Sequence, residues 1–71
     1  MTNYRRILMY LQSIAPDVAT NADIREATGV EPHQQVYQLT QRLMREKRIH
    51  GAKRGRVWDF CVAPQERPKR P

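Results

Sequence analysis

The sequence is poor in cysteine and histidine, the side chains that build disulfides and most zinc sites. Cys61 is the only cysteine and has no partner for an internal disulfide, which fits a reducing compartment. His33, His50 and Cys61 are the soft metal ligands, and their spacing lacks the paired pattern of zinc sites, so we expect no metal. No acid and base constellation accompanies Cys61, which we expect to be a structural residue rather than a nucleophile.

Long apolar runs and catalytic groupings are also absent. Without an apolar run, a signal peptide or a lipidation motif, the sequence predicts an intracellular, cytoplasmic protein rather than a membrane protein. A serine–histidine–aspartate grouping, a phosphate loop and an acidic metal pair are missing, and 71 residues leave little room for a buried active site. We therefore expect one small binding domain that is not an enzyme and uses no cofactor.

Basic side chains are what the sequence has in excess. There are 13 Lys and Arg residues against 7 Asp and Glu residues, a formal net charge of +6. This excess favours a polyanionic partner, because basic side chains displace the counterions condensed on phosphates. Between positions 42 and 56 the only acid is Glu46, and the basic residues are Arg42, Arg45, Lys47, Arg48, Lys53, Arg54 and Arg56. Such a run is either a solvated face or a nucleic-acid contact, and its place after a polar-faced helix favours the contact.

The first part of the chain has the apolar spacing of a helix. Ile7, Leu8, Leu11 and Ile14 predict a helix over Asn3 to Ile14 that buries this stripe and stops at Ala15 to Asp17. Val18 to Thr20 is long enough only for a single bridge of extended chain. Thr20 or Asn21 is suited to cap the helix that follows.

A short second helix is predicted from Ala22 to Thr28. It should end at Gly29, with Ile24 and Ala27 facing inward. Pro32 then opens a third, longer helix, a position where its missing N–H does no harm. A short helix, a turn with glycine and a longer helix with a polar face are the ingredients of a helix-turn-helix.

The third helix has two contrasting faces when its residues are placed at about 100° per position. The apolar face is formed by Val36, Leu39, Thr40 and Leu43. The opposite face is formed by Gln34, Gln38, Gln41 and Arg45, with Tyr37 and Arg42 at its margins. An amide presents a donor and an acceptor in one plane, which matches the major-groove edge of adenine, as arginine matches guanine. The competing interpretation is that these glutamines, Gln35 included, are good helix formers on a solvated face.

The third helix is followed by the pattern of a hairpin. Two strands, Ile49 to Ala52 and Arg56 to Val62, are predicted around Lys53-Arg54-Gly55. Trp58, Phe60 and Val62 alternate on one side, as a half-buried strand requires, and we expect Trp58 in the core or at its edge. The turn is therefore a basic tip on a rigid base.

The last eight positions are rich in proline and basic residues. We divide the chain into a domain over positions 1–63 and a tail over positions 64–71, which is expected to be extended or disordered. The tail is either a linker to a further domain or an arm that adds non-specific affinity for phosphate.

Positions 7 to 62 resemble a winged helix-turn-helix domain, an α+β fold of three helices with a small C-terminal β-hairpin wing. The segments that carry the resemblance are Ile7-Leu8-Met9-Tyr10-Leu11, Asn21 to Val30, Val36 to Arg45 and Lys53-Arg54-Gly55-Arg56. One departure is Lys47-Arg48, where family members often have a glycine. Either a non-glycine residue adopts a left-handed conformation there or the helix ends differently, which puts the orientation of the wing in doubt.

The resemblance implies a double-stranded DNA-binding protein. In this family the recognition helix enters the major groove and the wing contacts the backbone or an adjacent minor groove. Carried over by position, the groove residues are Gln34, Tyr37, Gln38, Gln41 and Arg45, and the backbone or wing residues are Arg42, Lys53, Arg54 and Arg56. A transcription regulator, associated with the nucleoid, and the DNA-reading module of a larger protein both fit.

A narrower resemblance rests on Val36-Tyr37-Gln38-Leu39-Thr40, Leu43, Ile49 and Gly55 to Phe60. These residues are similar to winged-helix modules beside the nuclease domains of restriction enzymes, some of which sense adenine methylation. The resemblance implies that the protein belongs to a restriction-modification system. It also implies that Trp58 or Tyr37 lies against the methyl group of a methylated adenine.

Two other classes stay open. A protein–protein adaptor would expose an apolar patch, and none is evident in the sequence. An RNA or single-strand binder would expose aromatic residues for stacking, and Tyr37 is the one candidate. As a DNA-binding domain, one such module covers only a few base pairs, so we expect an attached catalytic domain or a homodimer to supply specificity.

Overall fold

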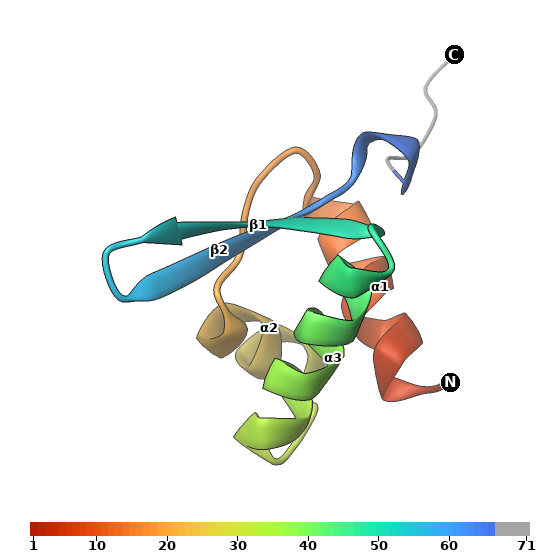
Figure 1. Ribbon diagram of the computed structural model, residues 1–71. Coiled ribbons are helices and arrows are strands. Elements are labelled where there is room, and N and C mark those ends of the chain that lie inside the picture. Colours follow the sequence, from red (N-terminus) through yellow and green to blue (C-terminus); the bar gives the residue numbers. More distant parts are fainter. Residues whose placement is uncertain (67–71) are drawn as a thin grey trace.

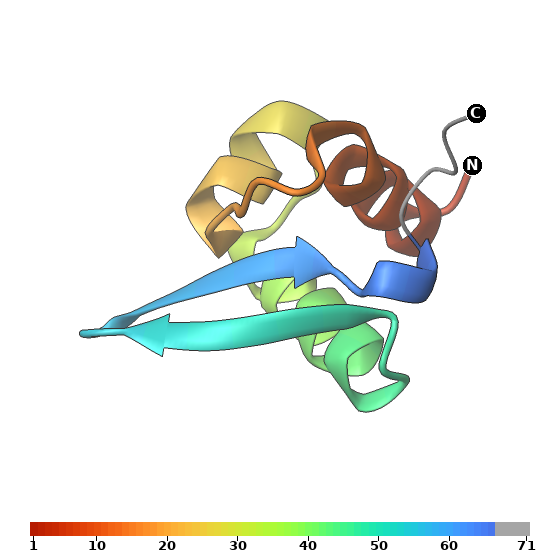
Figure 2. The same cartoon turned by 90° about the horizontal axis from the view of Figure 1, so that it is seen from above.

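The chain folds into three helices followed by an antiparallel hairpin (Figure 1). This description comes from a computed structural model and covers residues 1–66. The elements are α1 (Asn3–Ile14), α2 (Asn21–Thr28), α3 (His33–Arg45), β1 (Ile49–Arg54), β2 (Val57–Val62) and a short 3-10 turn, η1 (Pro64–Glu66). The layout is α+β and winged helix-like, as the sequence predicts. The hairpin lies across the helices and its tip extends beyond them (Figure 2).

Local capping interactions set the ends of α1 and α2. The Thr2 hydroxyl accepts a hydrogen bond from the Arg5 amide at the start of α1, whose bounds are those predicted. At α2, Thr20 and Asp23 form a reciprocal capping box, so the helix begins at Asn21, one residue before the predicted start. Gly29 ends α2 in the left-handed conformation, with a φ of 72°, as its position predicts.

The end of α3 is closed without a glycine. Pro32 is the N-cap of α3, one position before the helix proper. At the other end, the amides of Lys47 and Arg48 donate to the carbonyls of Met44 and Leu43. Lys47 has a φ of 61°, so of the two alternatives posed by Lys47-Arg48 the left-handed non-glycine residue is the one present.

The hairpin is tighter than predicted. Its register pairs Gly51 with Phe60, Lys53 with Trp58 and Arg54 with Val57, which leaves Gly55 and Arg56 in the turn. The predicted strand bounds are therefore wrong by two residues at the end of β1 and by one at the start of β2. Gly55 has a φ of 64°, which suits a two-residue hairpin turn. The single bridge predicted within positions 18–20 is confirmed, because Ala19 pairs with Phe60.

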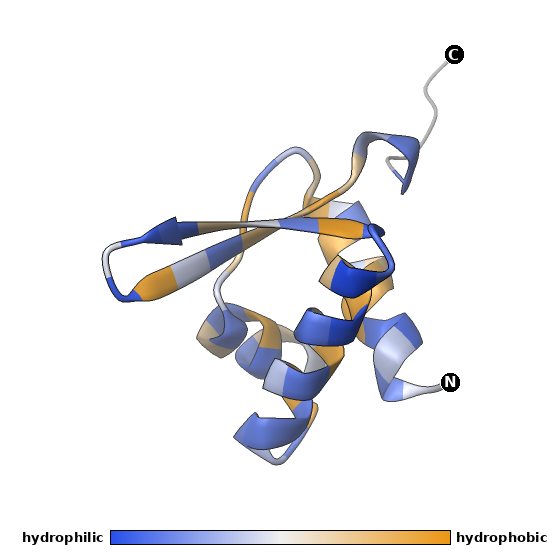
Figure 3. Ribbon diagram, viewed as in Figure 1, coloured by the Kyte–Doolittle hydropathy of each residue, from blue (hydrophilic) through white to orange (hydrophobic). Residues whose placement is uncertain are grey.

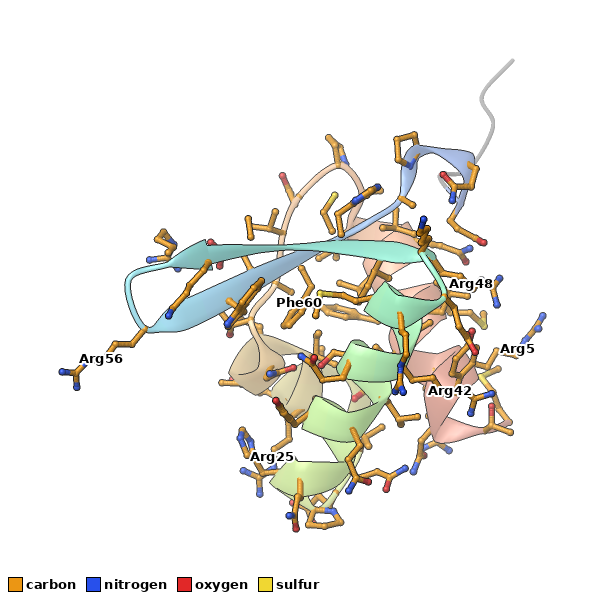
Figure 4. All side chains as sticks on the ribbon, in the orientation of Figure 1. Arg5, Arg25, Arg42, Arg48, Arg56 and Phe60 are labelled. Carbon is orange, nitrogen blue, oxygen red and sulfur yellow. The ribbon has the colours of Figure 1, made fainter. Side chains whose placement is uncertain are left out.

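The core lies between the three helices and the hairpin. Each helix contributes its apolar stripe, and β2 inserts Phe60, which is fully buried and visible between the hairpin and the helices in Figure 4. The buried residues are Ile7, Leu8, Leu11, Ala19, Ile24, Val30, Val36, Leu39, Thr40, Leu43, Ile49, Phe60, Val62 and Ala63. Replacing Phe60 by Ala would cost about 3–5 kcal/mol, a large share of the stability of a domain this small.

Two residues expected inside lie outside. Ala27 is exposed, because α2 turns Ile24 inward and the edge of the core lies on the Thr28 side of the helix. Thr28 is about 40° from Ile24 around the helix, and Ala27 is about 60° from it on the other side. Val30, just after α2, is buried instead. Trp58 is 40% exposed, because it borders an open hollow between the hairpin and the start of α2.

The segment after β2 begins with structure rather than with an extended tail. Pro64–Glu66 forms the 3-10 turn η1, and the Glu66 carboxylate accepts two hydrogen bonds from Arg48, at 2.8 and 3.1 Å. Positions 64–66 are therefore not the extended chain that was expected. The rest of the predicted tail, positions 67–71, lies outside the described residues. Across positions 1–66, none of the helices has the length and apolarity needed to cross a membrane.

Candidate nucleic-acid interface

The outward face of α3 is polar along its length. Val36, Leu39 and Leu43 are buried against the other helices and β1, so the residues on the opposite side of the helix must face solvent. In Figure 3 the part of the α3 ribbon turned toward the viewer is coloured mainly as hydrophilic. The exposed residues predicted for the groove are Gln34, Tyr37, Gln38 and Arg45, and Gln41 is half-buried. The structure therefore brings all five predicted groove residues onto one helix, with Gln41 set deepest.

The buried stripe of α3 is locked to the start of α2 by one polar contact. Thr40 is fully buried, and its hydroxyl donates to the Asn21 side chain over 2.9 Å. No buried side-chain nitrogen or oxygen in residues 1–66 is left without a partner. The bond fixes α3 relative to α2, which gives the exposed amides a rigid support.

The C-terminal end of α3 carries a cluster of ion pairs that faces α1. Arg42 donates to Glu46 over 3.2 Å, and its guanidinium stands over the Tyr4 ring, 4.6 Å from the centroid. The Tyr4 hydroxyl donates to Glu46 and accepts from Arg48. Figure 4 shows Arg42 and Arg48 on this side of the molecule, away from the hairpin tip. Arg42, predicted to contact the DNA backbone, is thus engaged within the protein.

The charges of this cluster stabilise one another. The hydrogen bonds from Tyr4 and then Arg42 hold the pKa of the Glu46 carboxyl below its ordinary value. The hydrogen bonds from Arg48 likewise lower the pKa of the Glu66 carboxyl, and Glu66 raises the pKa of Arg48 in return. The cluster joins α1, the end of α3 and η1, so its role is to hold these elements together.

The hairpin tip carries three basic residues in two different states. The Arg54 guanidinium donates to both carboxylate oxygens of Asp59, at 2.8 and 3.2 Å. This pairing lowers the pKa of the Asp59 carboxyl and raises that of Arg54. Lys53 and Arg56 are exposed and form no salt bridge within residues 1–66, and Figure 4 shows Arg56 projecting away from the tip. Of the three predicted wing residues, Lys53 and Arg56 carry uncompensated charge, and Arg54 does not.

The tip stands beside the start of α2 rather than beside α3. Arg54, Arg56 and Val57 line an open hollow together with Thr20 and Asn21. The base of the hairpin is the part that packs on α3, through β1. A ligand that touched both the α3 face and the tip would therefore have to span the hairpin, as an extended polyanion does.

The sequence did not reveal that two of the predicted DNA contacts are neutralised. For Arg42, the spacing to Glu46 is i,i+4 on one helix, which is a readable signal. For Arg54, the partner Asp59 lies across the hairpin, and only the register, Arg54 with Val57 and Ala52 with Asp59, places the two side chains on the same face. The docking of Glu66 on Arg48 had no signal in the local sequence.

The remaining candidates do not assemble into a reactive site. His33 is exposed in the first turn of α3 and His50 is exposed in β1. Cys61 is half-buried, with its thiol 3.5 Å from the Pro16 carbonyl. Within the described part of the chain, no three His, Cys, Asp or Glu residues are grouped to hold a metal ion.

Trp58 and Tyr37, the two residues implied as methyl contacts, are on different elements. Tyr37 is on α3 and 46% exposed, and Trp58 is on β2 and 40% exposed. Both rings are therefore open to a ligand.

In comparisons with known proteins, no family model, no curated protein and no solved structure matches the chain.

Proposed function

We propose that this domain binds double-stranded DNA, with α3 in the major groove and the hairpin tip on the phosphate backbone, and that it performs no chemistry of its own. It belongs, on this proposal, to the winged helix-turn-helix class, as a transcription regulator or as the DNA-reading module of a larger protein. The observation that carries the proposal is the α3 face, where Gln34, Gln38 and Arg45 are exposed opposite a fully buried stripe.

The charge distribution supports the same proposal. The net charge is +6, and Arg45, Lys53 and Arg56 are exposed without an ion-pair partner in residues 1–66. Uncompensated cations at the end of the α3 face and at the hairpin tip suit a duplex, because phosphate contacts position a protein while amide and guanidinium groups read base edges. The protein–protein alternative draws on two apolar residues of β2, Val57 and Trp58, which are each 40% exposed and both line the hollow beside α2.

Selection of duplexes from a random pool tests the proposal. We expect a preferred site to emerge, and Gln38→Ala to weaken binding to that site by about 1–3 kcal/mol while changing binding to unrelated duplexes little. Gln12→Ala is a matched control, because Gln12 lies on α1 and its amide bonds to Glu66. An equal loss on all duplexes would assign Gln38 to the backbone. Failure of the pool to yield any bound duplex, from a protein that purifies free of nucleic acid, would favour the adaptor.

A second candidate function is the sensing of adenine methylation, within a restriction-type nuclease. The exposure of Tyr37 beside the glutamines of α3 is the observation that favours it. Repeating the selection with N6-methyladenine in the pool tests this candidate. Tighter binding of the methylated form of the same site, reduced by Tyr37→Ala, is the expected result. Equal binding of the two forms would exclude it.

A further inference from the structure

An open hollow lies between the hairpin and the start of α2, apart from the polar face of α3. It has a volume of about 440 Å³ and is lined by Thr20, Asn21 and Ala22 on one side and by Arg56, Val57 and Trp58 on the other. Its size falls within the range of about 300–1,000 Å³ that small-ligand sites occupy. The hollow combines an aromatic ring, an aliphatic side chain and a cation, which the α3 face does not.

The Trp58 ring is anchored on one side and open on the other. A methyl group on Gly51 would lie 3.2 Å from the indole, 3.1 Å from the Phe60 ring and 2.5 Å from the Met44 sulfur, so these three side chains close over the glycine. The indole therefore packs against Gly51 on one side, while the residue as a whole is 40% exposed. Val57, the preceding residue, is exposed to the same extent. An exposed aromatic ring that packs on one side can bind a flat ligand at a small cost in side-chain entropy.

The charge at the rim selects the kind of ligand. Arg54 also lines the hollow, but its guanidinium is held by Asp59, so the net charge that the two contribute is zero. Arg56 is exposed and has no ion-pair partner in the described residues. A ring beside a free guanidinium suits a nucleotide, whose base stacks on the indole while its phosphate meets the cation.

The bases of a continuous duplex cannot stack on the Trp58 ring. Within B-form DNA each base is stacked on both faces, so an aromatic side chain reaches a base face only where the base is unpaired or extruded. The wall of the hollow is joined to α3 on the buried side of that helix, where Asn21 accepts a hydrogen bond from Thr40. A strand that leaves a duplex bound on the outer face of α3 would therefore pass along the hairpin to reach the hollow.

We propose that the hollow between the hairpin and α2 binds an unpaired nucleotide of the DNA, stacked on Trp58 and held at its phosphate by Arg56, so that the domain prefers duplexes with a single-stranded end, gap or extruded base. The inference rests on the proposed function, since α3 supplies the duplex contact. It extends that function from base sequence to DNA structure.

Fluorescence gives a direct test, because Trp58 is the only tryptophan of the chain. The full-length protein is titrated with two duplexes of the same sequence, one blunt and one with a short single-stranded extension. Affinity is measured by anisotropy of labelled DNA, and stacking by quenching of Trp58 emission. We expect tighter binding of the extended duplex, with quenching that the blunt duplex does not produce.

Two variants assign the preference to the ring. Trp58→Leu should reduce the ratio of the two affinities by about 5-fold to about 150-fold, the range that base stacking on an aromatic ring contributes. If the whole preference is smaller than that, the variant should lose it completely. Trp58→Phe should keep most of it. Met9→Ala removes an exposed apolar side chain on α1, far along the chain from the hollow, and should leave the ratio unchanged.

The outcomes separate the two proposals. Equal affinity for both duplexes, with no difference in Trp58 emission, would overturn the nucleotide site and leave the duplex-binding function standing. Quenching by a single-stranded oligonucleotide, with no binding of blunt duplex, would support the hollow and refute the α3 function. Absence of binding to the duplexes and to the single strand would overturn both.

Discussion

Replacing the basic residues of the hairpin tip should change how DNA binding depends on salt, and the structure predicts that Arg54 and Arg56 differ. Each phosphate that a protein neutralises adds about 0.9 to the slope of log affinity against log salt concentration. Arg56 is exposed with no ion-pair partner in residues 1–66, whereas the Arg54 guanidinium is paired with both carboxylate oxygens of Asp59. We therefore expect Arg56→Ala to flatten the slope by about 0.9. Between 50 and 200 mM salt, this change alters the ratio of affinities by about 3.5-fold.

Charge-matched variants isolate the contribution of Arg54. The double variant Arg54→Ala/Asp59→Ala removes one cation and one anion that already neutralise each other, and should leave the slope unchanged. Asp59→Asn frees Arg54 and should steepen the slope, by up to about 0.9. The variant Arg54→Ala/Arg56→Ala should flatten it by about one unit if Arg56 alone meets a phosphate and by about two if Arg54 also does.

The assay is anisotropy of a labelled duplex over a series of salt concentrations. The slope is a better readout than the affinity at one concentration, because it counts phosphate contacts separately from base contacts. An unchanged slope for Arg56→Ala would show that Arg56 does not contact the DNA backbone. The hairpin tip would then not be part of the proposed DNA interface. A large flattening in Arg54→Ala/Asp59→Ala would show that DNA displaces Asp59 from Arg54.

Two further predictions concern stability. Thr20→Ala removes the hydroxyl that caps α2 and should lower the stability by about 1 kcal/mol, which is a fall in Tm of about 4–8 °C. Thr20→Ser keeps a hydroxyl and should retain most of this stability. Equal Tm values for the Ala and Ser variants would refute the cap. For Glu66, the folded pKa lies below the ordinary value of 4.5, so its pairing with Arg48 stabilises the fold above that pH and is lost as the pH falls through the lowered pKa. The difference in Tm between the wild type and Glu66→Gln should accordingly be present at neutral pH and vanish in acid, and a difference that does not change with pH would contradict the ion pair.

Most of the fold could be predicted from the sequence because its signals are local. The Thr20 cap, Gly29 and the apolar spacing of α1 and α3 act within one or two turns of the chain, and they fix helix ends and faces. The left-handed residue at Lys47 was one of the two alternatives that the absence of glycine after α3 left open.

Depth of burial could not be predicted in the same way. Strand alternation placed Trp58 and Phe60 on one face correctly, but whether a residue on that face is covered depends on how far the helical layer extends under the hairpin. Phe60 has Ala19 and apolar side chains of the helices against it, whereas Trp58 borders the open hollow beside the start of α2. The pairing of Arg54 with Asp59 could not be predicted either, since the register that joins the two residues exists only in the folded hairpin.

A nuclear magnetic resonance titration of the uniformly ¹⁵N-labelled protein with a selected duplex tests the central proposal most directly, because side-chain amides of glutamine are resolved individually. The α3 face predicts that the amide signals of Gln34, Gln38 and Gln41 shift on binding together with the backbone of Arg56. The amides of Gln12 and Gln65, which bond to Glu66 and to the Lys47 carbonyl, should stay in place. Shifts confined to Gln12, Gln65 and the surface of α1 would contradict the proposal.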